Sequence, residues 1–160
     1  MPAGRRGSSL LEVIVVFGIL GAMVALMWTA GPYLRRLSLH AAAGTLVGDL
    51  RAVQAKAIAE RVATRSYGIV FSVPSDRYTL VISNRSLRTP LRVVRLAPGV
   101  TITYARFGGG APTAALFSSS SLFGAPSGAG TVTLRAGPSA LCVRVLPATG
   151  RIRVADTNCP

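Results

Sequence analysis

The residues of this chain that could do chemistry are few and scattered. Its 160 residues include five acids, one histidine (His40) and 18 lysines and arginines, for a formal net charge of +13. The acids fall in different segments: Glu12, Asp49, Glu60, Asp76 and Asp156. No carboxylate pair is placed for acid–base catalysis, and one histidine with two cysteines cannot supply the four ligands of a usual zinc site. We therefore expect neither an enzyme nor a cofactor.

The densest charge lies near the C-terminus, in the stretch CVRVLPATGRIRVADTNC. If residues 147–150 form a four-residue hairpin loop, Arg144 faces Arg153 and Arg151 lies on the same face. Like charges opposite one another destabilise a strand pair, and only Asp156 is near in sequence. The cluster therefore predicts an anionic ligand, nucleic acid or lipid headgroup. A GC-rich genome would also explain why 17 of the 18 basic residues are arginine.

The same hairpin has an apolar face and two cysteines. The expected core face consists of Val143, Val145, Ile152 and Val154. Cys142 and Cys159 suggest a disulfide if the domain lies outside the cytoplasm. A loop of this size is worth roughly 3 kcal/mol in the chain-entropy account. The bond would also hold the arginines in place and so lower the entropy cost of binding.

One carboxylate stands in an otherwise apolar run. Between residues 10 and 28 only Glu12 is charged, and Arg5 and Arg6 precede the run. As a helix this run is about 28 Å long, close to the thickness of a bilayer's hydrocarbon core. A carboxylate there costs roughly 2.5–3.5 kcal/mol on insertion scales and normally has a partner. Glu12 therefore needs an explanation beyond membrane anchoring.

Three interpretations of the opening segment compete. A cleaved secretory signal peptide needs small residues at its cleavage site, where the best candidate places Trp28. A single-span anchor that is never processed accounts for the hydrophobicity but leaves Glu12 unexplained. The third interpretation is a short basic leader, residues 1–7, which is removed so that the new amine at Ser8 lies one helical turn from Glu12.

A single apolar stripe follows the membrane-length run. Its members recur at alternating spacings of four and three: Leu39, Ala43, Leu46, Leu50, Val53 and Ala57. Such a stripe is the buried face of an amphipathic helix. We expect one helix over residues 9–64, its first half in the membrane and its second half packed on a domain, with Pro32 bending but not ending it.

From residue 67 the apolar period changes to two, which predicts strands. The expected strands are 67–73, 78–83, 91–96, 100–107, 131–135, 141–146 and 151–155. Residues 74–77 and 147–150 are expected to be hairpin turns, and the Gly/Ala/Ser/Pro-rich residues 108–130 an irregular excursion. A helix followed by antiparallel strands is an α+β order, which excludes a doubly wound nucleotide-binding fold.

Gly7 followed by SSLLE resembles the processing site of type IV prepilins and type II secretion pseudopilins. The resemblance implies cleavage between Gly7 and Ser8 by a prepilin peptidase, N-methylation of Ser8, and retention of Glu12 as the fifth mature residue. Ser8 departs from the usual phenylalanine. In a packed fibre the Glu12 carboxylate would meet the amine of a neighbouring subunit.

The rest of the chain resembles the GspH/FimT branch of these proteins. GTLVGDLRAVQAKAIAERVATRSYGIVFS, FSSSSLFGAPSGAGTVTLRAG and VRVLPATGRIRV are similar to successive parts of that family. The resemblance implies a type IV pilin-like fold: leader 1–7, transmembrane half-helix 8–30, amphipathic half-helix 31–65 and β-rich domain 66–160. It also implies an inner-membrane, single-pass protein with a periplasmic domain, which then assembles with other pilins or pseudopilins.

The resemblance leaves two functions open. GRIR, residues 150–153, is similar to the Gly-Arg-x-Arg motif of FimT-type minor pilins, which bind DNA in natural transformation. This implies a minor pilin of a type IV pilus, with Arg151 and Arg153 on the phosphates of double-stranded DNA, Arg144 beside them, and no sequence preference. The alternative is a GspH-like minor pseudopilin of a type II secretion system.

Overall fold

The computed structural model describes residues 8–60, 62, 64–84, 87–108, 113–119, 125–147, 149–156 and 159. By their contacts these residues form two units, divided between Leu34 and Arg35. The helix α1 (Ser8–Glu60) contributes to both units. Each unit is described by itself.

The first unit is the beginning of α1. Its apolar side chains face outward: Leu10 and Phe17, for example, are both 70% exposed. An 18-residue window of α1 has a mean hydropathy of 2.6 with none of it buried, so the helix is long and apolar enough to cross a membrane. Pro32 lies inside α1, which confirms that it does not end the helix.

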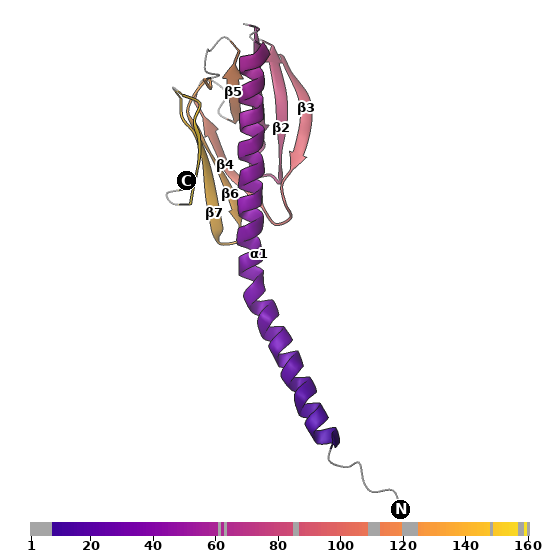
Figure 1. Ribbon diagram of the computed structural model, residues 1–160. Coiled ribbons are helices and arrows are strands. Elements are labelled where there is room, and N and C mark those ends of the chain that lie inside the picture. Colours follow the sequence, from indigo (N-terminus) through magenta and orange to yellow (C-terminus); the bar gives the residue numbers. More distant parts are fainter. Residues whose placement is uncertain are drawn as a thin grey trace, which may run out of the picture. The chain divides into compact units, whose positions relative to one another are not determined.

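The second unit contains two antiparallel sheets and the rest of α1 (Figure 1). One sheet has the strand order β3-β2-β1-β5 and the other β4-β6-β7-β8. The strands are β1 (Arg65–Phe71), β2 (Arg77–Asn84), β3 (Leu87–Arg95), β4 (Thr101–Phe107), β5 (Ala114–Ser118), β6 (Gly130–Ala136), β7 (Ser139–Val145) and β8 (Ile152–Ala155).

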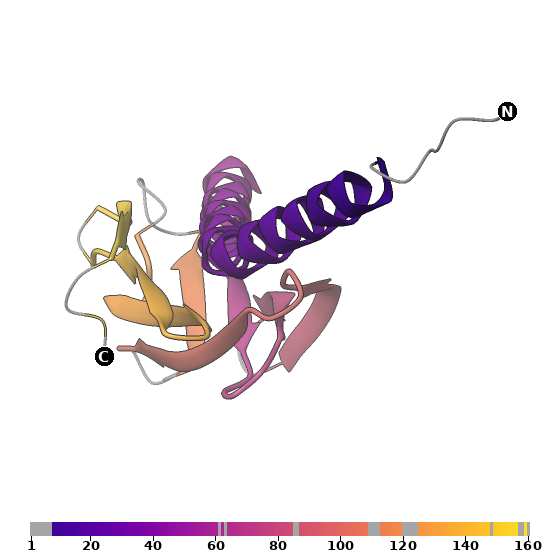
Figure 2. The ribbon, with the colours of Figure 1, turned by 90° about the horizontal axis from the view of Figure 1, so that it is seen from below.

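The predicted apolar stripe of the helix is the core of this unit. All six of its residues are buried: Leu39, Ala43, Leu46, Leu50, Val53 and Ala57. They share one cluster with side chains of both sheets, such as Tyr67 from β1 and Leu134 from β6. Figure 2 shows this part of α1 lying over the two sheets. The expected α+β arrangement, a helix packed on antiparallel strands, is confirmed.

The helix ends earlier than predicted, at Glu60 and not at residue 64. The amide of Arg65 donates to the carbonyl of Val62 (2.9 Å), a turn that redirects the chain into β1. The Glu60 carboxylate accepts a hydrogen bond from the hydroxyl of Tyr67 and lies 3.8 Å from the Arg65 guanidinium. Pairing with the sheet therefore overrides the helical pattern in this segment.

The expected irregular excursion contains a strand. β5 pairs antiparallel with β1, and Phe117, opposite Tyr67, is fully buried. Gly68 makes the pairing possible, because a Cβ there would lie 2.3 Å from the Ala115 carbonyl oxygen and 2.6 Å from the Leu116 side chain. The prediction of irregular structure was therefore wrong for residues 114–118. Residues 109–112 and 120–124 of that stretch lie outside the described residues.

A hydrogen-bonded acid ties the helix to the sheet that contains β2 and β3. Asp49 accepts a hydrogen bond from the buried Tyr78 hydroxyl (2.6 Å) and another from the Arg92 guanidinium (2.8 Å). Burial raises the pKa of Tyr78 above its ordinary value of 10.0, and the bond to Asp49 raises it further. The phenol therefore stays protonated in the folded state well beyond the pH at which it ionises in the unfolded chain.

This raised pKa predicts a loss of stability in alkali. A group whose folded pKa is raised contributes stability that is complete below the unfolded value, about pH 10, and is lost as pH rises through the folded value. The free energy of unfolding should fall by about 1.4 kcal/mol per pH unit for this tyrosine. Urea unfolding by circular dichroism tests this, with Tyr78→Phe as the comparison. An equally steep alkaline loss in Tyr78→Phe would contradict the assignment.

Candidate functional site

The C-terminal hairpin has the predicted register. Val145 lies opposite Ile152 and Arg144 opposite Arg153. Beyond these pairs the Leu146 amide donates to the Arg151 carbonyl (3.0 Å), and the Gly150 amide donates to the Leu146 carbonyl (3.0 Å). Gly150 has φ of 62°, a left-handed conformation that favours glycine. The loop thus fixes which side chains share each face of the hairpin.

One of the four residues expected in the core is not buried. Val143, Val145 and Ile152 are buried, whereas Val154 is 47% exposed. Val154 has the register of the core face, opposite Val143, but it lies on β8, the edge strand of its sheet. An edge strand has a neighbour on one side only, so the predicted burial of Val154 was wrong.

The arginines lie on the other face. Arg151 and Arg153 are exposed, and Arg144 is half-buried. Among the described residues, no carboxylate lies within ion-pair distance of Arg151 or Arg153. Asp156 is three residues beyond Arg153, about 10 Å along an extended strand. Within the described part of the chain, the charges of Arg151 and Arg153 are therefore not neutralised by a contacting acid.

The pairing extends this arginine face across the whole sheet. Arg153 lies opposite Arg144, Arg144 opposite Thr131, and Thr131 opposite Arg106. Residues paired in this way point to the same side, so Arg106, Thr131, Arg144 and Arg153 form one row from β4 to β8. Arg106 is exposed and was missed in the sequence. The period-two pattern of residues 100–107 is consistent with Tyr104 and Arg106 on one face of the strand. The pattern alone cannot show which strand lies beside that of Arg106.

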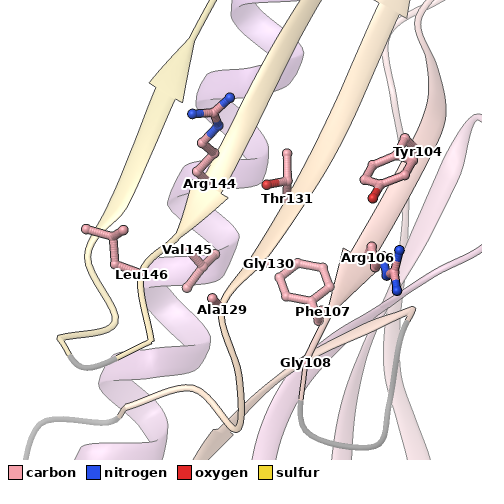
Figure 3. A pocket seen from close by; sticks show the side chains of 10 residues that line it. All are labelled: Tyr104, Arg106, Phe107, Gly108, Ala129, Gly130, Thr131, Arg144, Val145 and Leu146. Carbon is pink, nitrogen blue, oxygen red and sulfur yellow. The ribbon is translucent and has the colours of Figure 1, made fainter. Parts of the chain in front are cut away.

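A depression lies at one end of this row (Figure 3). Figure 3 shows Arg144 and Arg106 on either side of Thr131, with Tyr104 near Arg106. The cavity has a volume of about 500 Å³, and its lining also includes Phe107 and Leu146. None of the five acids of the chain lines it. Two guanidinium groups and two hydroxyls around such a depression can hold an anion.

The cysteines lie on the same face as the arginines. Cys142 and Cys159 are joined by a disulfide, with their Cα atoms 5.6 Å apart. Cys142 is two residues before Arg144 on β7, so its side chain points to the side of the arginine row. The bond therefore fixes the end of the chain to the sheet close to the arginines.

Of the three candidate residues near the N-terminus, the structure describes Ser8 and Glu12 but not Gly7. Gly7 and the rest of the expected leader lie outside the described residues, and Ser8 is the first residue of α1. Glu12 is exposed on the first unit. In the described part of the chain, no three or more histidines, cysteines or acids gather into a possible metal site.

Solved structures share this architecture. EpsH, the minor pseudopilin of the type 2 secretion system of Vibrio cholerae, superposes with a TM-score of 0.58 and 16% identity, over 76% of this chain and 99% of its own. FimU, a type IV minor pilin of Pseudomonas aeruginosa, superposes with a TM-score of 0.57 and 18% identity, over 80% and 96%. The chain has the type IV pilin-like fold. A second crystal form of FimU agrees, with a TM-score of 0.55 and 17% identity over 76% and 97%.

No protein-family profile and no curated protein sequence matches the chain. The pilin-like fold is therefore established by structure and not by sequence similarity. At this identity the fold itself does not distinguish a pilus subunit from a secretion subunit, because the matching structures include both kinds. The distinction therefore has to come from particular residues, those of the arginine face.

Proposed function

We propose that the chain is a minor subunit of a type IV pilus. In this proposal a prepilin peptidase cleaves between Gly7 and Ser8, and the new amine of Ser8 is methylated. The pilin-like fold supports it, together with a helix able to cross a membrane. The domain faces the periplasm before assembly, which suits its disulfide because such bonds persist in oxidising compartments.

Glu12 is the assembly residue in this proposal. It becomes the fifth residue after cleavage, where its carboxylate meets the amine of a neighbouring subunit. An ion pair in the low dielectric of a packed helical bundle is much stronger than in water. The pair would also fix the register between neighbouring helices, because a helix shifted along the bundle would leave both charges unpartnered.

DNA is the proposed ligand of the arginine face. The observation that carries this step is the row of arginines that ends at Arg153, with Arg151 beside it. Neither Arg151 nor Arg153 has a contacting acid among the described residues. Phosphates of double-stranded DNA would lie against Arg151 and Arg153, and Arg144 would support them. Such contacts position the nucleic acid but read no sequence.

A GspH-like minor pseudopilin of a type II secretion system is the second candidate. The fold supports it as well as it supports the first candidate, since the match covers 99% of the EpsH chain and 96% of the FimU chain. A pseudopilin of this kind has no need of DNA binding. The two candidates therefore differ at the arginine face and agree on processing and on Glu12.

Processing is tested by the intact mass of the chain recovered from its own cell envelope. We expect a species that lacks residues 1–7 and carries one added methyl group. A Gly7→Val variant should keep the full-length mass, because a branched side chain replaces the small residue at the cleavage site. A wild-type chain that still begins before Ser8 would contradict the pilin and the pseudopilin proposals together.

DNA binding is tested with the full chain in a non-ionic detergent and a labelled duplex, by fluorescence anisotropy at several salt concentrations. Arg151→Ala/Arg153→Ala should weaken binding at least tenfold and reduce the salt slope by about 2, since each lost phosphate contact removes about 0.9. Arg51→Ala/Arg88→Ala is the matched control, with the same charge change on exposed residues of α1 and β3. Absence of binding at low salt would favour the pseudopilin.

A further inference from the structure

The depression beside the arginine row is shaped by the residue between two arginines. Thr131 lies opposite Arg106 on one side and Arg144 on the other. A short side chain between two long ones leaves a trough, which we call the Thr131 trough. Figure 3 shows Arg106 and Arg144 at its two sides. Nothing in the hairpin motif of residues 150–153 requires this feature.

The chemistry of the trough suits one phosphate group. Arg106 and Arg144 present guanidinium groups, which bind phosphate oxygens in pairs of hydrogen bonds. The hydroxyls of Thr131 and Tyr104 add donors that a phosphate can also use. Three of the five acids form ion pairs with other arginines: Asp49 with Arg92, Glu60 with Arg65, and Asp76 with Arg77. Neither these three nor Glu12 and Asp156 line the trough. An anion in the trough therefore meets no lining carboxylate.

The width of the trough restricts what enters it. β4 and β7 lie on either side of β6, so the two arginines are separated by two strand spacings, about 10 Å. A trough of this width can seat a single nucleic acid backbone, whether that backbone belongs to a single strand or to one side of a duplex. The half-buried ring of Tyr104 beside it offers an aromatic face of the kind on which single-stranded bases stack.

We propose that the Thr131 trough seats one phosphodiester of a nucleic acid strand, with Arg106 and Arg144 on its two sides and a flanking base stacked on Tyr104. This inference rests on the proposed DNA binding and adds Arg106 to it, three strand spacings or about 14 Å from Arg153 at the far end of the row. The phosphodiester is common to single strands and duplexes. The stacked base is available only in a single strand or a frayed end.

The test compares a 12-nucleotide single strand with the duplex of the same sequence, using the full chain in a non-ionic detergent. Arg106→Gln should weaken binding of both at least fivefold, and Arg106→Lys should recover most of the loss. Arg88→Gln, an exposed arginine on the other sheet, makes the same charge change and should weaken binding less than twofold. Tyr104→Leu should weaken the single strand about tenfold and the duplex less than twofold.

Two outcomes separate this inference from the proposal beneath it. If Arg106→Gln behaves like Arg88→Gln while Arg151→Ala/Arg153→Ala still loses the duplex, the trough is overturned and DNA binding by the hairpin stands. If the wild-type chain binds neither strand nor duplex, the proposed DNA binding fails. Hydrogen exchange with inorganic pyrophosphate then decides the trough: protection of residues 129–134 supports an anion seat, and unchanged exchange overturns it.

Discussion

The Glu12→Ala chain is expected to be cleaved and inserted in the membrane like the wild type, but to fall at least tenfold in sheared pili. Insertion should not suffer, because removing a carboxylate from the apolar run removes a cost of roughly 2.5–3.5 kcal/mol. Assembly should suffer, because the amine of the neighbouring subunit is left without its partner in a low dielectric. Immunoblotting of the membrane and sheared fractions measures both quantities.

Two further variants separate charge from packing at this position. Glu12→Asp keeps the carboxylate on a shorter side chain and should give intermediate incorporation. Val13→Ala alters a neighbouring exposed apolar residue and should leave incorporation within twofold. Wild-type amounts of Glu12→Ala in sheared pili would mean that helix packing alone holds the subunit, and the proposed ion pair would have to be abandoned.

The helix was predictable because its apolar spacing can be read within one continuous segment of the sequence. Six stripe positions with spacings of three and four can face one direction only in a helix, and all six are buried in the structure. The end of the helix was less predictable. The apolar stripe stops at Ala57 and does not mark the last helical residue, and the contacts of Glu60 with Tyr67 and Arg65 of β1 come from the tertiary fold.

β5 shows where local pattern fails. Its sequence AALFS has small residues and only two large apolar ones, which by themselves favour no particular structure. What makes it a strand is the neighbouring β1, where Gly68 lets the backbone of β5 approach. A sequence cannot show this close approach, because the two segments are more than forty residues apart.

In the candidate site, too, contacts between residues close in sequence were predictable and contacts between distant segments were not. The hairpin pairs were predictable because a short loop fixes the register between residues close in sequence. Arg106 was not, because β4 pairs with β6 while the intervening β5 belongs to the other sheet. The row that joins Arg106 to Arg153 is therefore a property of the topology, and only its C-terminal half could be inferred from the chain.

The Gly130→Ala substitution is expected to destabilise the domain by about 3 kcal/mol, roughly 10 °C in melting temperature. A Cβ on Gly130 would lie 1.9 Å from Cδ1 of Phe107, its partner across β4 and β6. The Phe107 ring cannot simply move aside, since it is buried and stacked on Phe71 with centroids 5.7 Å apart. In a close-packed interior such an overlap shifts side chains or backbone.

A second glycine provides the matched control. Gly44 lies on the exposed side of α1, and apart from the adjoining helix backbone no atom lies within 4 Å of its would-be Cβ, so Gly44→Ala should stabilise the chain by about 0.5–1 kcal/mol through helix propensity. Phe107→Leu should relieve part of the loss in the Gly130→Ala chain, because the smaller side chain leaves room for the methyl group. Unchanged stability of Gly130→Ala would show that Phe107 can adapt.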